Sequence, residues 1–314
     1  MKAIVVTDRS AGTAGMTLVE RPEPDVAMLA SLEGANYGDV VVEVHASGFT
    51  GNELEWPSTW VDRRGLDRTP SIPGHEVAGV VSALSYGATG LSVGQRVFGL
   101  TEWTRDGTLA EYVVVEARNL APLPGDIDFT VGAGIAMAGL TAWQGLFDHG
   151  RLREGQSVLV HGAAGAVGSM ATQLARHAGA HVIGTGRAGG RQTAADFGAH
   201  EYVDLDNDTL EDVGGVDLVF DVIGGDIQKR SARLVRAGGT LVTVTGPPEA
   251  RPMDGLAIDF VVVSDRAQLE EIARLVREGR LRTNIGTVAA LDDAVAAFNP
   301  TQRTWGKTVI RVRP

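Results

Sequence analysis

A short apolar strand, followed at once by spaced glycines and a helix, constrains this chain more than any other feature of its sequence. Ser157–His161 is a run typical of a buried strand, and Gly162-Ala-Ala-Gly165-Ala-Val-Gly168 follows it directly. Helical spacing of apolar residues then extends over Val167–Ala178. The pattern predicts a tight turn from a strand into a helix, as in alternating α/β structures.

Such a turn can bind a pyrophosphate, because the free N–H groups of a helix start and the helix dipole both favour an anion. Gly162 would allow the tight turn, Gly165 and Ala166 would admit the phosphates, and Gly168 would let the helix pack on the sheet. The spacing alone is a weak signal, and a plain packing turn is the alternative. The turn residues expected to contact a dinucleotide are Gly162, Ala164, Gly165, Ala166, Val167 and Gly168.

The second strand of this unit ends in Ile183-Gly-Thr-Gly-Arg187. A carboxylate about 20 positions after the glycines would bind the ribose 2′-hydroxyl of NAD, and none stands there. Arg187 does, with Arg191 four residues later, and a guanidinium pairs with a 2′-phosphate. The sequence therefore predicts NADPH, bound also by Thr185 and Gly186. The alternative is that both arginines are solvated surface residues.

The strand–turn–helix unit lies within a longer alternation of strands and helices, which predicts a doubly wound parallel sheet with helices on both faces. The expected helices are Thr130–Asp148, Val167–Ala178, Arg191–Phe197 and Ile227–Leu234. The expected strands are Ser157–His161, His181–Gly184, Glu201–Val203, Asp217–Val222, Thr240–Thr245 and Phe260–Val263.

The first 120 residues are instead typical of a small β-barrel, with Gly, Pro, Ser and Asn between the strands. Its expected strands are Lys2–Thr7, Asp39–Ala46, Glu76–Ser82, Arg96–Gly99 and Ala110–Val115. The Pro-rich segment Ala121–Gly125 is the expected boundary, so we expect a first domain over 1–124 and a second over 125–264. Residues 265–314 would complete the first domain with helices at Arg266–Glu278 and Leu291–Phe298 and a last strand at Lys307–Val312.

Charge and composition exclude several functions. A net charge of −11 argues against a nucleic-acid or anionic-membrane partner, and 5% aromatic residues argue against a base-stacking surface. The absence of cysteine excludes disulfides, thiolate catalysis and zinc sites built on Cys ligands. No run of 18 apolar residues predicts a membrane span, and charge appears too early for a signal peptide, so we expect a cytoplasmic protein.

With these motifs in view, the chain resembles the medium-chain dehydrogenase/reductase superfamily, and most of all its zinc-free NADPH:quinone oxidoreductases. The matching stretches run in order along nearly the whole chain: Ile72-Pro-Gly-His-Glu-Val-Ala-Gly-Val, Val93-Gly-Gln-Arg-Val-Phe-Gly, Ala110-Glu-Tyr-Val, Ala138-Gly-Leu-Thr-Ala-Trp, residues 158–169 and Gly306-Lys-Thr-Val.

The resemblance implies a GroES-like β-barrel catalytic domain, closed by the C-terminal strand, and a Rossmann domain, with the cofactor in the cleft between them. It also implies a homodimer formed by edge pairing of the strand near Phe260–Val263. Further residues that the resemblance places against the cofactor are Thr141, Val222, Ile223, Thr245, Gly246, Phe260, Val261 and Val262.

The chain departs from the zinc-containing members of that superfamily. Thr50 stands where they carry a cysteine, and His75 and Glu76 are what remains of their motif. Zinc needs about three protein ligands, so we expect no metal and interpret His75 as a hydrogen-bonded residue at a strand start. Lys307 either contacts the cofactor or forms a surface ion pair.

Without zinc, no Lewis acid polarises an ordinary alcohol or carbonyl oxygen. Hydride transfer from NADPH remains possible to an acceptor that is already electrophilic, such as a quinone or an α,β-unsaturated carbonyl. Thr50 and Asn52 are the candidate catalytic residues, because the loop that carries them faces the nicotinamide in relatives; turn hydrogen bonds are their alternative role. Glu53 aligns with an Asp that is usually structural in the family.

Trp56, Trp60 and Trp103 either cover a flat acceptor or pack in the core. No acid–base group stands out in the sequence. Two further functions therefore stay open: an enoyl-thioester reductase of the same superfamily, and a catalytically idle NADPH-binding protein.

Overall fold

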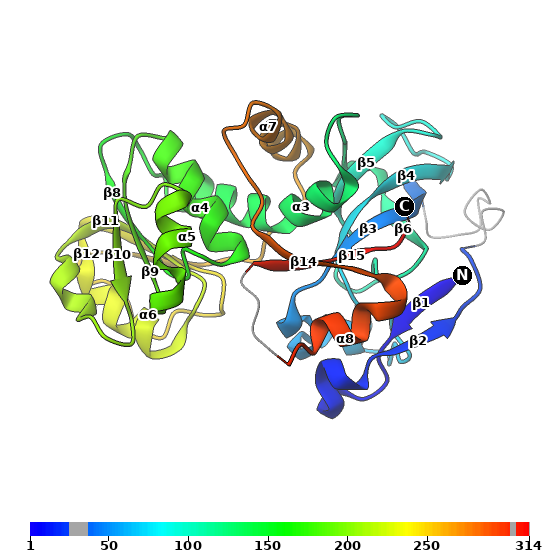
Figure 1. The fold of residues 1–314 in the computed structure, drawn as a ribbon, viewed down its shortest axis with the longest axis horizontal. Coiled ribbons are helices and arrows are strands. Elements are labelled where there is room, and N and C mark those ends of the chain that lie inside the picture. The colour runs from blue at the N-terminus through cyan, green and yellow to red at the C-terminus, as the bar shows by residue number, and fades with distance from the viewer. Residues whose placement is uncertain (25–36, 302–305, 314) are drawn as a thin grey trace. The chain divides into compact units, whose positions relative to one another are not determined.

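The computed structural model describes residues 1–24, 37–301 and 306–313. Contacts divide the chain into two compact units, and Figure 1 shows strands and helices in both. The first unit comprises Met1–Met137, Ser264–Arg277 and Ile285–Pro314, and the second comprises Ala138–Val263 and Glu278–Asn284. The α/β class predicted from the sequence is confirmed.

The first unit is built on a seven-stranded sheet with the order β14-β15-β3-β4-β5-β7, in which β6 also pairs with β3. Valines at alternate positions of β3 face a core shared with β4, β5 and β6, as the period of a strand requires. The strands are β3 (Asp39–Gly48), β4 (Glu76–Leu84), β5 (Arg96–Leu100), β6 (Tyr112–Glu116), β7 (Leu120–Pro122), β14 (Ile285–Ala290) and β15 (Lys307–Arg311).

A two-stranded ladder of β1 (Lys2–Val5) and β2 (Thr17–Glu20) covers a second core cluster of the same unit. Short helical turns and a few longer helices connect the strands. They are η1 (Arg9–Gly15), η2 (Gly51–Glu55), α2 (Pro57–Trp60), η3 (Ala117–Asn119), α7 (Arg266–Arg277), η8 (Leu291–Asp293) and α8 (Ala294–Phe298), together with α3 (Phe129–Trp143), whose residues from Ala138 onward lie in the second unit.

The second unit contains a six-stranded parallel sheet with the order β10-β9-β8-β11-β12-β13. The chain moves outward from β8 to β10 and returns to β11 beside β8, so the strand order reverses between β8 and β11. Open parallel sheets bind ligands at the carboxyl edge of such a point. The strands are β8 (Ser157–Val160), β9 (His181–Gly186), β10 (Glu201–Asp204), β11 (Val216–Asp221), β12 (Val235–Thr243) and β13 (Gly255–Asp259).

The helices of the second unit are η4 (Gln144–His149), α4 (Ala166–His177), η5 (Ala188–Gly190), α5 (Arg191–Asp196), η6 (Leu210–Val213), α6 (Gly225–Ser231) and η7 (Ala232–Leu234). Of these, α4, α5 and α6 with η7 confirm three predicted helices, η4 ends the predicted helix Thr130–Asp148, and the short turns η5 and η6 were not predicted.

The expected strand at Phe260–Val263 is wrong. The edge strand is β13, which ends at Asp259 opposite Thr243 of β12. Beyond it, the side-chain amide of Gln144 donates to the carbonyl oxygen of Val263 at 2.8 Å and accepts from its N–H at 3.1 Å. These backbone groups therefore pair with a side chain instead of a neighbouring strand.

The expected boundary also differs from the structure. Within Ala121–Gly125, Pro122 pairs with Val97 of β5, so this segment belongs to the sheet of the first unit. The division falls later, after Met137 inside α3, and residues 278–284 return to the second unit. A proline can end a ladder at an edge strand without ending a domain.

Candidate functional site

The glycine turn between β8 and α4 has the geometry that its sequence predicts. Gly162 has φ of 66°, a left-handed conformation that favours glycine, and its carbonyl oxygen accepts from the N–H of Gly165 at 2.8 Å. A Cβ on Gly168 would overlap that same carbonyl, so only glycine fits there. No side chain caps the start of α4 at Gly165. The first N–H groups of α4 are therefore available to an anion.

The turns that follow β11 and β12 lie at the same edge and are fixed by one buried carboxylate. Oδ1 of Asp221 accepts from the N–H groups of Ile223 and Gly224, each at 3.0 Å. Oδ2 accepts from the hydroxyl of Thr243 at 2.8 Å. Asp221 thus holds together two turns predicted to line the cofactor.

The remaining cofactor residues predicted from the sequence follow the carboxyl ends of the parallel strands, except Thr141, which is buried in α3. A Cβ on Gly162 would lie 3.0 Å from Cγ2 of Val222, so the turns after β8 and β11 are neighbours. Residues 222–223 follow β11, 245–246 follow β12, and 260–262 follow β13.

A buried histidine lies beneath the glycine turn. Nε2 of His161 is 2.7 Å from Oγ of Ser231, whose own proton goes to the carbonyl oxygen of Ile227. Nε2 must therefore donate, and Nδ1 accepts from the hydroxyl of Thr185 at 2.7 Å. Burial lowers the pKa of His161 to about 4, so the ring is neutral. The side chain of Thr185, predicted to contact the cofactor, is engaged with this histidine.

The two arginines predicted to bind a 2′-phosphate lie in and after the turn that follows β9. Nε of Arg187 is 4.0 Å from Oδ2 of Asp206, and Nη2 of Arg191 is 3.2 Å from Oδ2 of Asp208. Sequence reasoning missed these carboxylates, although Asp204-Leu-Asp-Asn-Asp208 is an acidic run directly after a strand. It also missed Asn284, whose amide donates to the carbonyl oxygen of Ala164 at 2.7 Å and supports the glycine turn.

In the first unit, three rings gather around the start of β4. The ring of His75 lies 5.0 Å from that of Trp103 and is stacked on Trp56 at 6.1 Å. Nδ1 of His75 is 2.8 Å from the hydroxyl oxygen of Thr101, which confirms the prediction of a hydrogen-bonded strand start. Burial lowers the pKa of His75 to about 3, so this aromatic cluster carries no charge at neutral pH. Trp60 lies elsewhere, with its N–H donating to the carbonyl oxygen of Leu54.

The loop with the two candidate catalytic residues is anchored by Glu53. Its carboxylate accepts from the N–H of Thr50 at 2.8 Å and from the N–H of Gly74 at 3.0 Å. Burial raises the pKa of Glu53 to about 8. Thr50 is half-buried, whereas Asn52 is exposed. The structure therefore joins Thr50 to the backbone beside His75 through a single side chain.

A buried ion pair links the start of β4 to β15 and α3. Nζ of Lys307 bonds Oε2 of Glu76, and Oε1 accepts from the N–H of Met137 at 3.0 Å. Burial raises the pKa of Glu76, while Lys307 opposes that change. A surface ion pair was one sequence interpretation of Lys307; the pair exists, but it is buried, because β15 lies inside the sheet.

The described part of the chain contains no cluster of metal ligands. Within residues 1–24, 37–301 and 306–313, no three His, Cys, Asp or Glu side chains lie close enough to hold an ion. Nδ1 of His75 is engaged by Thr101, and its ring is stacked on Trp56 and makes an edge contact with Trp103. Zinc requires about three such ligands, and His75 by itself does not supply them.

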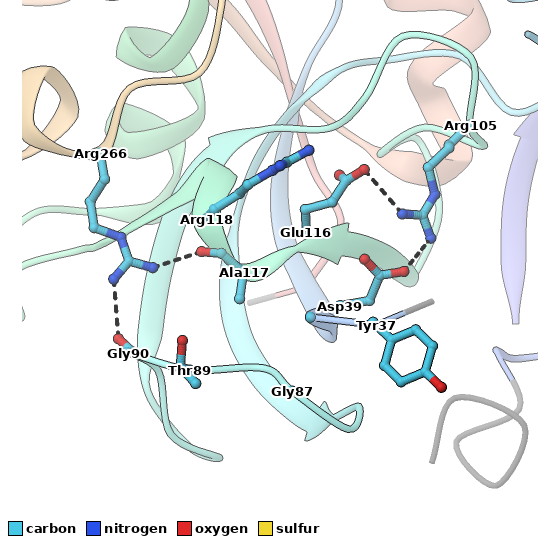
Figure 2. Close-up of a pocket in the computed structure, with 11 residues that line it drawn as sticks. Tyr37, Asp39, Gly87, Thr89, Gly90, Arg105, Glu116, Ala117, Arg118 and Arg266 are labelled. Carbon is cyan, nitrogen blue, oxygen red and sulfur yellow. Dashed lines mark hydrogen bonds and ion pairs between the residues drawn. The ribbon is translucent and has the colours of Figure 1, made fainter. Parts of the chain in front are cut away.

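The first unit also contains a cavity of about 690 Å³, shown in Figure 2. Arg105 is held between Asp39 at 2.7 Å and Glu116 at 3.3 Å. Arg266 donates to the carbonyl oxygens of Gly90, Ala117 and Leu120. Of the three arginines that line the cavity, Arg105 and Arg266 are therefore engaged by the protein itself. This makes the cavity a weak candidate for a dinucleotide site.

Comparison with known proteins gives a consistent picture. Residues 36–125 match the family model described as an alcohol dehydrogenase GroES-like domain, and residues 197–310 match the one described as a zinc-binding dehydrogenase. The chain is 30% identical to a quinone oxidoreductase of Mus musculus over 86% of this chain and 87% of that protein. Within the described residues, no helix is long and apolar enough to cross a membrane.

Two further similarities extend these matches. A 2-methylene-furan-3-one reductase of Solanum lycopersicum is 33% identical over 78% of this chain, which spans 64% of that protein. The solved structure of a quinone oxidoreductase from Coxiella burnetii superimposes with a TM-score of 0.87 at 25% identity, and covers 100% of this chain and 99% of that one.

Proposed function

We propose that this chain, which belongs to the quinone oxidoreductase-like proteins of the medium-chain dehydrogenase/reductase superfamily, reduces a quinone or an α,β-unsaturated carbonyl with NADPH and without zinc. Members of this family are oxidoreductases that use a nicotinamide coenzyme, and so is this chain. The observation that carries the proposal is the glycine turn. Its open helix start and its requirement for glycine at residue 168 suit a bound diphosphate.

The second unit supplies the proposed coenzyme site. The N–H groups at the start of α4 would bind the diphosphate, and Arg187 would pair with the 2′-phosphate. No carboxylate stands at the position that would select NAD, which supports NADPH. When bound, the coenzyme supplies the hydride; the protein supplies position and electrostatics. The other coenzyme contacts proposed are those of Thr141 and of residues 222–223, 245–246 and 260–262.

The first unit supplies the proposed acceptor site. Trp56 and Trp103, with neutral His75, form an apolar aromatic surface that suits a flat conjugated ring. The hydroxyl of Thr50 would orient the acceptor oxygen, and Asn52 is the second polar candidate on this loop. An acceptor whose negative charge delocalises onto a conjugated oxygen needs no Lewis acid, which agrees with the poor fit to zinc.

The activity is tested by following the oxidation of NADPH with para-benzoquinone, methyl vinyl ketone and crotonyl-CoA as separate acceptors. We expect turnover with the first two, unchanged after dialysis against a chelator. Turnover with crotonyl-CoA alone would favour an enoyl-thioester reductase. Tight NADPH binding without turnover of any acceptor would favour a catalytically idle protein. Loss of activity with the chelator would contradict the zinc-free mechanism.

We also propose a homodimer. β13 is an edge strand of the six-stranded sheet, and Leu256 on it is 60% exposed. An open edge with an exposed apolar residue favours pairing with another strand, here β13 of a second copy. Sedimentation should give twice the mass of the chain; a monomer at all concentrations would contradict this.

A further inference from the structure

The two arginines near the expected 2′-phosphate are not equivalent. Nη1 of Arg191 donates to the carbonyl oxygen of Tyr202 at 2.9 Å, and Nη2 donates to Asp208 at 3.2 Å. Its guanidinium also lies over the ring of Tyr202, 5.1 Å from the centroid. Arg191 is therefore engaged on several sides by the protein and holds the start of α5 against β10.

Arg187 is far less engaged. Its side chain is 66% exposed, and its one partner among the described residues is Asp206, itself 63% exposed, at 4.0 Å. An exposed pair at that distance contributes little stability and exchanges readily with other ligands. Arg187 is the guanidinium that remains available to a phosphate, and Asp206 is the group already facing it.

The backbone on both sides of this pair is fixed. The hydroxyl of Tyr202 donates to the carbonyl oxygen of Arg187 at 2.8 Å. Oδ1 of Asp204 accepts from the N–H of Asp206 at 3.2 Å. Asp204 lies opposite Gly186 in the parallel register of β10 and β9, so the residues that follow each strand are neighbours at one sheet edge. The backbone therefore keeps the carboxylate of Asp206 beside Arg187 at the carboxyl ends of β9 and β10.

We propose that Asp206 sets the preference of this protein between NADPH and NADH, because its carboxylate shares Arg187 with the 2′-phosphate of NADPH. The inference rests on the proposed function and names a specificity residue within that site. The carboxylate competes with the phosphate for this guanidinium, whereas NADH carries no phosphate at this position. Because both groups are exposed, water and salt screen the effect, so a change of about three- to tenfold is expected.

The test is to measure the dissociation constants of NADPH and NADH by fluorescence for the wild type and for Asp206→Asn. We expect NADPH to bind about three- to tenfold more tightly to the variant, NADH to change less than about twofold, and the gain to shrink in high salt. Asp254→Asn is the matched control. Asp254 is exposed and precedes β13 at the opposite edge of the sheet, so it should alter neither constant.

A second variant, Arg187→Gln, distinguishes sharing of Arg187 from direct repulsion of the phosphate by Asp206. In Arg187→Gln, the effect of Asp206→Asn on NADPH should fall below about twofold, because the shared partner is gone. A full gain in that background, equal gains for both coenzymes, or an unchanged ratio in the single variant would each overturn the inference. Failure of the wild type to bind either coenzyme would instead overturn the proposed function.

Discussion

At the scale of single residues, the environment of Glu53 differs strongly from water. The side chain is fully buried, and burial raises its pKa to about 8, although two backbone N–H groups favour the charged form. The same carboxylate fixes Thr50 and Gly74. The loop proposed to contact the acceptor therefore depends on a group whose charge changes near neutral pH.

This pKa predicts how stability varies with pH. A carboxyl whose pKa is higher in the folded state than in the unfolded state contributes stability that is complete below pH 4.5 and is lost as the pH rises to about 8. Relative to Glu53→Gln, the wild type should lose on the order of 4 kcal/mol of unfolding free energy across that range, at about 1.4 kcal/mol per pKa unit. Denaturant titrations at several pH values measure the difference.

Glu55→Gln is the control for this experiment. Glu55 lies in the same short turn and is exposed, so its removal should leave the pH profile of the wild type unchanged. If the profiles of wild type and Glu53→Gln ran parallel from pH 4.5 to 8, the raised pKa of Glu53 would be contradicted.

Single residues also show where sequence reasoning succeeds. Gly162 and Gly168 could be predicted because the backbone itself demands glycine: one has a positive φ, and the other touches a carbonyl oxygen. The positions of Tyr202, Asp206 and Asn284 could not. Their partners lie on other strands or loops, and nothing in the local pattern states which residues the fold brings together.

At the scale of elements, the start of α4 is the part of the fold on which the coenzyme site depends. Gly168→Ala would force a methyl group into the carbonyl oxygen of Gly162, and overpacking of this kind costs about 1–3 kcal/mol. We expect the variant to lower the melting temperature of the protein and to weaken binding of NADPH. Calorimetric unfolding with and without coenzyme measures both.

Gly165→Ala is the matched control in the same turn. Its Cβ would lie 3.2 Å from that carbonyl oxygen, which a small shift relieves, so its loss of stability should be clearly smaller. Equal melting temperatures for Gly168→Ala and the wild type would show that the turn is looser than the structure has it.

The elements of the second unit were largely predictable because buried parallel strands are continuous apolar runs. The same rule failed at Phe260–Val263, where an apolar run follows the edge strand and Gln144 engages the backbone of Val263. The strands β2, β7 and β14 were missed because short or half-exposed strands lack such runs; β14, for example, alternates between half-buried and exposed residues.

At the scale of the whole molecule, neither unit is one continuous range of residues, because the chain returns to each unit after leaving it. The buried pair of Lys307 and Glu76 joins residues 231 positions apart in the sequence, and residues 278–284 rejoin the second unit after α7. Two domains could be predicted from length and from the change of rhythm. The residues at which the chain passes from one unit to the other could not be predicted, because contacts between distant segments leave no local signal in the sequence.

The overall charge bears on the coenzyme as well. A net charge of −11 disfavours the approach of an anion, so binding of NADPH has to come from local groups: the N–H groups at the start of α4 and the guanidinium of Arg187. Because so few groups attract the coenzyme, the single nearby carboxylate of Asp206 is expected to change the selectivity between NADPH and NADH.

Calorimetric titration of the purified protein with NADPH and with NADH measures whether the turn over residues 162–168 holds the diphosphate of a reduced nicotinamide coenzyme. We expect one NADPH to bind per chain, more tightly than NADH. Absence of heat and of fluorescence change with both coenzymes would contradict it.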